Sequence, residues 1–391
     1  MTITSSNSSR IHSLDSLRGI MMMLGIVLHS AITYGEINYG YGWSLKDPNH
    51  TDVSNDFIVA LIHSFRMQTF FLVAGFFGAL LFYERSPKSM IRNRLERIVL
   101  PFLAFLFILW PTIKFAFTYS GMVFNGDSAS TAMSFSIADL FSLSSLTPTS
   151  TFHLWFLYDL IFISSFGIGF AFLGKGIPRV SRMINILFSW LIRQPILRVL
   201  VFGLMTAIVL FLIKTPNVPA SASFVPNFLA LTYYFSFYMV GWILFKSKDL
   251  LNHLTKGDWI STLLGLTLFT INFIYGKSLE LDFFHKILIN GLIVWLLIFG
   301  ITGLFIRYAS HHSPLMRYLS DSSYWVYLAH LTFTALIPGL IKDWEIASTL
   351  KFLFVMTLTG IICFVSYHFL VRDTFIGKFL NGRRYPRKLS S

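Results

Sequence analysis

Residues 15–34 read DSLRGIMMMLGIVLHSAITY, and this stretch decides the fold. A helix of about 20 residues, rising ~1.5 Å at each residue, is long enough to cross the roughly 30 Å hydrocarbon core of a membrane. The run is almost entirely apolar between Arg18 and His29, and it contains no small-residue cleavage pattern. We therefore expect a retained membrane-spanning helix rather than a removed signal peptide.

The rest of the chain has the same character. Of its 391 residues, 54% are hydrophobic and only 13% are charged, and the mean hydropathy is +0.65. Soluble domains carry about 25% charged residues, so a soluble fold is excluded. We expect an all-α, polytopic membrane protein that forms a single membrane-embedded domain over 1–391, with an N-terminal tail at 1–14 and a basic C-terminal tail at 371–391. Its transmembrane helices number about ten, near 15–34, 56–83, 98–118, 152–173, 198–214, 225–245, 258–276, 285–306, 319–339 and 349–370.

The basic residues indicate the topology. The formal charge is +13, but Lys and Arg are spread between the apolar runs instead of forming one stripe, so nucleic acid is not an expected partner. They concentrate in alternate loops, and the positive-inside rule then places both termini in the cytoplasm. Segments 35–55 and 119–151 would face outward, as ordinary solvated loops or, alternatively, as contacts for a polar substrate. Cys363 is the sole cysteine, which excludes an intrachain disulfide and a Cys-based metal cluster.

Arg18 and His29 share one face of the first helix. They are eleven residues apart, and eleven steps of about 100° end only ~20° past three full turns. The rise between them is roughly 16 Å, so His29 lies near the middle of the membrane when Arg18 lies at the cytoplasmic boundary. A charged residue at the centre of a membrane helix costs about 2.5–3.5 kcal/mol on insertion scales, and such residues usually mark function. An interfacial anchor is the alternative role for Arg18.

Two further spans carry basic residues to the same depth. His63 and Arg66 lie three residues apart on the second span, which brings Arg66 near mid-membrane. His330 reaches that level on the ninth span, with Tyr327 one turn below it. We expect His29, Arg66 and His330 to converge on one cavity. The alternative is that His330 only makes a hydrogen bond between packed helices.

Arginines also gather where the third span begins, at the cytoplasmic boundary. Arg94 and Arg97 have the i,i+3 spacing that presents two guanidiniums together, and Arg92 lies beside them. Planar guanidinium forks suit phosphate oxygens. The alternative is a positive-inside flank that touches lipid headgroups.

The fourth span begins at the outer surface with His153 and Trp155. An interfacial aromatic belt accounts for Trp155. His153 is less easily explained in that way, because a polar acceptor from outside would arrive near it.

These residues resemble the integral membrane acyltransferase family, often called acyltransferase type 3. The resemblance rests on Asp15-Ser-Leu-Arg18 with His29 after it and on Arg94-Leu-Glu-Arg97. Ile62-His-Ser-Phe-Arg66-Met-Gln-Thr-Phe-Phe71, Ala74-Gly-Phe-Phe77 and His153-Leu-Trp155-Phe-Leu157 are most similar to the branch associated with succinylation of osmoregulated periplasmic glucans. The similarity is strong over the first 160 residues and later rests on Ser323-Tyr-Trp-Val-Tyr327-Leu-Ala-His330.

The resemblance implies transfer of an acyl group from cytosolic acyl-CoA, with no bound cofactor, to a hydroxyl of a periplasmic glycan at the bacterial inner membrane. His29 would be the general base. Arg66 would stabilise the oxyanion or pair with a succinyl carboxylate. The remaining roles follow the same scheme: Arg18 and Asp15 line the donor opening, Arg92, Arg94 and Arg97 hold the phosphates of CoA, and His63, His153, Trp155, Tyr327 and His330 serve the acceptor or support the site.

Alternative functions remain at this point. Direct transfer is favoured over a covalent acyl-His intermediate, because one cavity open to both sides needs fewer steps. An O-acetyltransferase of lipopolysaccharide or another surface glycan would use the same residues with acetyl-CoA in place of succinyl-CoA. A secondary transporter is disfavoured, because transporters usually couple through acidic residues and the residues at mid-depth here are basic.

Overall fold

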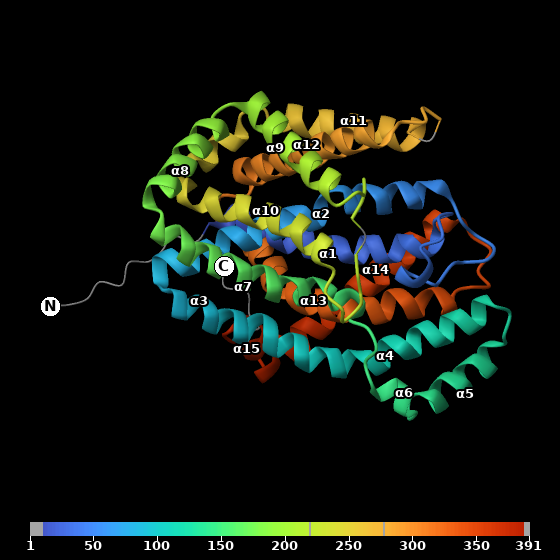
Figure 1. The fold of residues 1–391 in the computed structure, drawn as a ribbon. Helices are drawn as coiled ribbons and strands as arrows, with labels where there is room; N and C mark the ends of the chain where they lie inside the picture. The colour runs from blue at the N-terminus through green and yellow to red at the C-terminus, as the bar shows by residue number, and fades with distance from the viewer. Residues whose placement is uncertain (1–10, 219, 277, 387–391) are drawn as a thin grey trace.

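The structure, a computed structural model, describes residues 11–386 except 219 and 277, and within them every regular element is helical (Figure 1). Ten helices are long: α1 His12–Ala31, α2 Val53–Leu80, α4 Leu100–Phe124, α7 Trp155–Gly176, α9 Pro195–Leu212, α10 Phe228–Lys246, α11 Asp258–Tyr275, α12 Phe283–Tyr308, α13 Pro314–Leu340 and α14 Ser348–Ser366. Five are shorter: α3 Pro87–Arg94, α5 Ala129–Asp139, α6 Leu143–Leu146, α8 Pro178–Ile192 and α15 Phe375–Asn381. Wider π turns at Leu81–Arg85, Leu95–Val99 and Tyr367–Val371 extend α2, join α3 to α4 and extend α14.

The expected multi-pass helical membrane fold is confirmed. In the described part of the chain, nine helical segments are long and apolar enough to cross a membrane. Helix α13 is as long as these nine but more polar, with Arg317, Asp321 and several serines along it. It packs against α1, α4 and α14, and a helix enclosed by other helices can carry polar side chains that lipid would exclude. The prediction of about ten spans therefore corresponds to ten long helices, one of which is shielded from lipid.

Glycines bring α2 and α10 into backbone contact. A side chain at Gly75 would collide with the carbonyl of Tyr238, and one at Gly241 would collide with the carbonyl of Leu72. Small residues at helix interfaces allow this approach, and van der Waals packing then holds the two helices together inside the membrane. Because Arg66 lies on α2, this packing fixes its depth and direction.

Most described residues of segment 35–55 are exposed, as expected of a solvated loop, but the segment is also fastened to the helices. Lys351 on α14 forms an ion pair with Asp47 at 2.9 Å, and both side chains are fully buried. Lys351 also donates to the carbonyl of Lys342. The backbone N–H groups of Glu36 and Ile37 donate to the Asp56 carboxylate at the start of α2. Asp47 thus fastens this segment to α14, and the Asp56 carboxylate of α2 binds its backbone, whereas Glu36 and Asp52 are exposed.

The basic segment 174–198 contains a helix rather than an open loop. Helix α8 buries Phe188, Leu191 and Ile192 against the bundle, whereas Met183 and Leu187 are exposed. The basic segment after 371 likewise contains α15. Residues 1–10 and 387–391 of the two expected tails lie outside the described residues.

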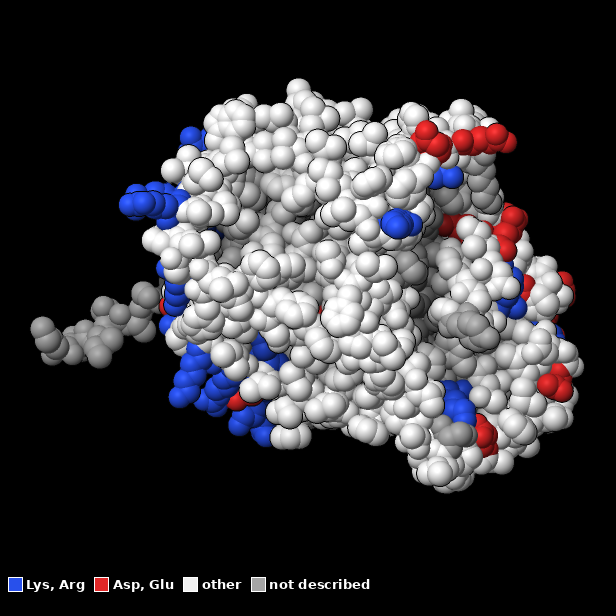
Figure 2. Space-filling model, in the orientation of Figure 1, with Lys and Arg blue, Asp and Glu red and all other residues white. Residues whose placement is uncertain are grey.

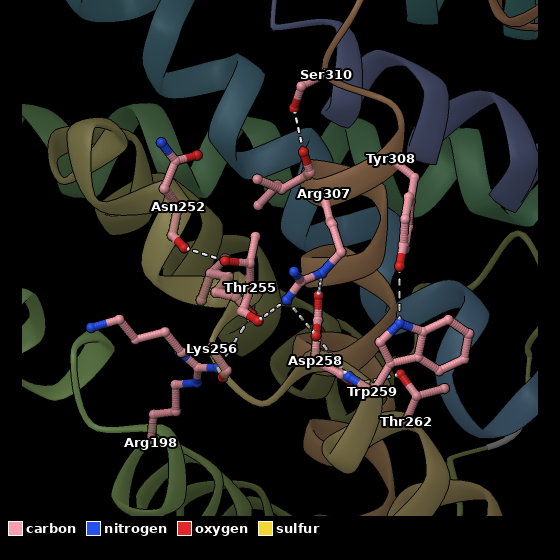
Figure 3. Close-up of polar contacts among 12 residues, drawn as sticks. Arg198, Asn252, Thr255, Lys256, Asp258, Trp259, Thr262, Arg307, Tyr308 and Ser310 are labelled. Carbon is pink, nitrogen blue, oxygen red and sulfur yellow. Dashed lines mark hydrogen bonds and ion pairs between the residues drawn. The ribbon is translucent and has the colours of Figure 1, made fainter.

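One buried arginine holds the turn between α10 and α11. The Arg198 guanidinium is fully buried and donates to the carbonyls of Ile192 and His253. It also donates to the carbonyl of Lys256 (Figure 3). Next to it, Arg307 binds both carboxylate oxygens of Asp258, at 2.7 and 3.0 Å. These contacts satisfy backbone carbonyls at the ends of helices, so Arg198 has a structural role although it belongs to a basic flank in the sequence.

Charge divides between the two ends of the bundle. In Figure 2 most Lys and Arg side chains gather at the end where α3 and α8 lie, and most Asp and Glu side chains lie toward the opposite end. This separation agrees with the concentration of Lys and Arg in alternate loops of the sequence.

Candidate active site

A small buried cavity lies where α1, α2, α13 and the start of α7 meet. It measures about 30 Å³. Its lining consists of Met22, His29, Arg66, Met67, Phe70, His153, Trp155, Phe156, Tyr327 and His330. The structure therefore brings together His29, Arg66 and His330, which the sequence placed at one depth. It adds His153, Trp155 and Tyr327 to them.

Arg66 is a buried cation. Its side chain is 9% exposed, and its Nε donates to the carbonyl of Met21 on α1 at 2.7 Å. Among the described residues no carboxylate pairs with it. Gly25 leaves the space that the guanidinium fills, because a Cβ there would lie 2.8 Å from Arg66 Nη2 and 3.2 Å from His330 Nε2. A buried guanidinium without an acidic partner is suited to bind an anion.

His330 and His153 are oriented by the backbone. The Nδ1 atom of His330 lies 2.8 Å from the carbonyl of Tyr327, so Nδ1 carries the proton and Nε2 keeps its lone pair toward Gly25. His153 Nε2 lies 3.1 Å from the carbonyl of Leu328, and the Tyr327 hydroxyl donates to the carbonyl of His153 at 2.7 Å. These reciprocal bonds fix the start of α7 against α13. The bonds of His330 Nδ1 stay within α13, and its Nε2 has no hydrogen-bond partner among the described residues, so His330 lines the cavity and does not make the interhelical hydrogen bond of the alternative interpretation.

His29 lies between two rings. Its imidazole stacks on Trp43, with centroids 5.2 Å apart, and lies 5.3 Å from the ring of His330. Its Nδ1 is buried without a hydrogen-bond partner. Trp43 and Gly25 could not be predicted from the sequence, because a loop tryptophan and a helix glycine carry no charge or periodic signal.

His63 does not line the cavity. It is exposed, whereas Arg66, three residues further along α2, is buried. Three residues amount to about 300° of rotation, so the two side chains diverge by roughly 60°. Its expected role as an acceptor or supporting residue stays a prediction.

Arg18 and Asp15 lie together at the start of α1. Arg18 Nη2 is 3.4 Å from Asp15 Oδ1, and the Arg18 guanidinium lies 5.6 Å from the ring centre of Phe77 on α2. Arg18 is partly exposed, with 38% of its side chain accessible. Part of its side chain is thus accessible from outside the bundle.

The three arginines of the third span contact different elements. Arg94 Nη2 donates to the carbonyl of Ala74 on α2 at 3.3 Å, and its Nε is buried without a partner. Arg97 Nη1 donates to the carbonyl of Lys378 in α15 at 3.0 Å. Arg92 pairs with Glu96 at 2.8 Å and is largely exposed. The expectation that Arg94 and Arg97 hold their guanidiniums side by side does not fit these contacts. The π turn at Leu95–Val99 lies between the two residues and changes the helical register that the expectation assumed.

The cavity offers imidazole nitrogens, a guanidinium and a tyrosine hydroxyl. Cys363 is buried in a different apolar cluster. Within the described part of the chain, no group of three or more His, Cys, Asp or Glu residues could hold a metal ion. This set of groups suits proton transfer beside a developing negative charge.

The family described as "Acyltransferase domain" matches residues 11–368. Two similar relatives, from Salmonella paratyphi B (strain ATCC BAA-1250 / SPB7) and Salmonella agona (strain SL483), are both described as "Glucans biosynthesis protein C". Each is 23% identical to this chain, with 98% of this chain and 97% of the relative covered. No solved structure matches.

Proposed function

The chain belongs to the acyltransferase family, and we propose that it is a multi-pass O-acyltransferase of the bacterial inner membrane, moving an acyl group from cytosolic acyl-CoA to a hydroxyl of a periplasmic glycan. One observation carries this proposal. His29, with an unpartnered Nδ1, shares a buried cavity with Arg66, a guanidinium that has no carboxylate partner among the described residues. This pairing supplies a base for a hydroxyl and a cation for the oxyanion.

The chemistry balances with these two groups. Neutral His29 takes the proton of the acceptor hydroxyl as its oxygen attacks the thioester carbon. Arg66 stabilises the negative charge on the carbonyl oxygen of the tetrahedral intermediate. When the intermediate collapses, the carbon–sulfur bond breaks and the imidazolium returns the proton to the CoA thiolate. His330 and His153, whose outer nitrogens are held by backbone carbonyls, keep the cavity in shape around this transfer.

The donor is proposed to arrive from the basic end of the bundle. The positive-inside rule makes that end cytoplasmic, together with both termini. Arg18 and Asp15 lie in the first two turns of α1 and would line the donor opening. Arg94 is proposed to contact the phosphates of CoA, with Arg92 and Arg97 nearby; Arg97 would have to release the carbonyl of Lys378 to do so.

The acyl group is proposed to be succinyl and the acceptor an osmoregulated periplasmic glucan. A buried succinyl carboxylate needs a cationic partner, and Arg66 offers one as the alternative to its oxyanion role; in that case another donor of the cavity must stabilise the oxyanion. The similar relatives carry the words "glucans biosynthesis" in their descriptions. At about 30 Å³ the cavity is smaller than either substrate, so its side chains must move for both to enter.

Mass spectrometry of periplasmic glucans tests the proposal. Glucans are compared from cells with the protein, cells without it and cells with His29→Ala. A mass increment that disappears in the last two establishes both the transferred group and the acceptor, and its size separates succinyl from acetyl. Unchanged glucans would rule out this acceptor, and lipopolysaccharide and other surface glycans would then be compared in the same strains.

A further inference from the structure

A large pocket opens at the basic end of the bundle, away from the buried cavity. Its volume is about 740 Å³, and it lies between α8 and the ends of α2, α7 and α10. Tyr83 and Trp190 contribute aromatic walls, and Ser181 and Ser189 contribute hydroxyls. None of these residues belongs to the proposed acyl-transfer site.

The charge of this pocket has one sign. Lys175, Arg182, Arg193 and Lys246 line it, and no Asp or Glu is among its lining residues. None of the four cations forms an ion pair with another residue in the part of the chain that the structure describes. Like charges gathered without counter-charge repel one another, so a bound anion would relieve the repulsion.

Two of the cations are held in place by neutral groups. Lys175 Nζ lies 5.1 Å from the ring centre of Phe82 and 5.3 Å from that of Phe172. Lys246 Nζ lies 4.9 Å from the ring centre of Tyr83 and donates to Ser181 Oγ at 3.3 Å. Cation–π contacts orient an ammonium group without neutralising its charge. Both lysines therefore remain attractive to an anion.

The two arginines are available to a ligand. Arg182 and Arg193 are exposed, and neither guanidinium makes a hydrogen bond within the described residues. Guanidinium forks match the oxygens of a phosphate group. Because these side chains do not support the fold, they can be changed without loss of internal contacts.

An apolar surface adjoins the pocket. On α8 the exposed side chains include Met183, Ile186 and Leu187, and Leu173 at the end of α7 is 67% exposed. A basic amphipathic helix with large apolar residues on one face lies in the membrane interface. A ligand with a phosphate head in the pocket would thus have a lipid-facing surface directly beside it for apolar chains.

We propose that this pocket binds the phosphodiester headgroup of an anionic phospholipid from the membrane leaflet on this side. The four cations hold the phosphate, and the acyl chains lie along the exposed faces of α7 and α8. Basic pockets between helices on the cytoplasmic side of membrane proteins bind such headgroups. The bound lipid holds α8 in contact with the ends of α2 and α10.

The test measures lipid binding to the full-length protein by native mass spectrometry in detergent. Phosphatidylglycerol is titrated into wild type, Arg182→Gln/Arg193→Gln and Arg179→Gln, with phosphatidylcholine as the zwitterionic comparison. Arg179 is the matched control, because it is an exposed arginine of α8 that does not line the pocket. Each lysine or arginine near an anionic surface raises the binding affinity by a factor of about five. The double variant should therefore bind the most tightly held phosphatidylglycerol molecule roughly 30-fold more weakly than wild type does.

Three results would overturn the proposal. The first is phosphatidylglycerol binding to the double variant as tight as that to wild type. The second is a loss of affinity in Arg179→Gln as large as that of the double variant, which would indicate a diffuse charge effect. The third is displacement of phosphatidylglycerol from wild type by inorganic phosphate at the same concentration, which would identify a soluble phosphate ligand. None of these measurements depends on the acyl-transfer reaction.

Discussion

The imidazole of His29 stacks on the indole of Trp43, with ring centroids 5.2 Å apart and planes 25° from parallel. Trp43 is itself fixed, because its Nε1 donates to Thr33 Oγ1 at 3.0 Å. A residue of the segment between α1 and α2 thus sets the orientation of the proposed general base. Asp47, four residues after Trp43, fastens that segment to Lys351 on α14.

Replacement of Trp43 should reduce turnover rather than donor binding. An aromatic stack contributes about 0.5–1.5 kcal/mol, so we expect Trp43→Ala to lower kcat about tenfold with the KM for acyl-CoA nearly unchanged. Trp43→Phe keeps a ring over His29 and should retain most of the activity. Steady-state kinetics on the purified full chain would measure both values. Equal losses in the two variants would contradict a role for the stack.

Gly25 should not tolerate any side chain. A Cβ at this position would lie 2.8 Å from Arg66 Nη2 and 3.2 Å from His330 Nε2, so Gly25→Ala must displace one of these groups. Misplacement by about 1 Å can cost 100-fold in rate, and we expect a loss of that order in kcat. Alanine favours a helix over glycine, so folding should not suffer.

Gly360→Ala provides the matched control for Gly25→Ala. Gly360 lies within α14, and no atom lies within 4 Å of the Cβ that alanine would add there. Kinetics and expression level of the two variants would be compared side by side. Activity in Gly25→Ala equal to that of Gly360→Ala would show that the cavity adapts to the added methyl group.

Some of this site could be predicted from sequence because straight helices have fixed geometry. Rise and rotation per residue were enough to bring His29, Arg66 and His330 to one depth. The same rules could not anticipate Trp43, because a loop has no period that sets where its side chains point. They also failed for Arg94 and Arg97, since a π turn between them alters the register that i,i+3 spacing assumes.

The buried ion pair between Lys351 and Asp47 should matter for stability. Removing one partner of a buried pair typically costs about 3–5 kcal/mol, because the other charge stays buried without compensation. We expect Lys351→Met to lower the free energy of unfolding by about that amount, measured by denaturation in mixed micelles. Lys342→Met is the control, since Lys342 Nζ lies 4.0 Å from a largely exposed Asp343. A loss no larger than the control's would show that the segment is held by its other contacts.

Arg94 should affect the donor more than the chemical step. Its guanidinium reaches the carbonyl of Ala74 on α2, and its buried Nε has no partner, so a donor phosphate would complete its hydrogen bonds. We expect Arg94→Ala to raise the KM for acyl-CoA about tenfold with little change in kcat, and Arg94→Lys to recover only part of the loss because lysine lacks the planar fork. Lys88→Ala, an exposed substitution on the same short helix α3, should leave both constants unchanged. If Arg94→Ala lowers kcat alone, the arginine acts on the reacting atoms or on the packing of α2, and the donor must bind elsewhere.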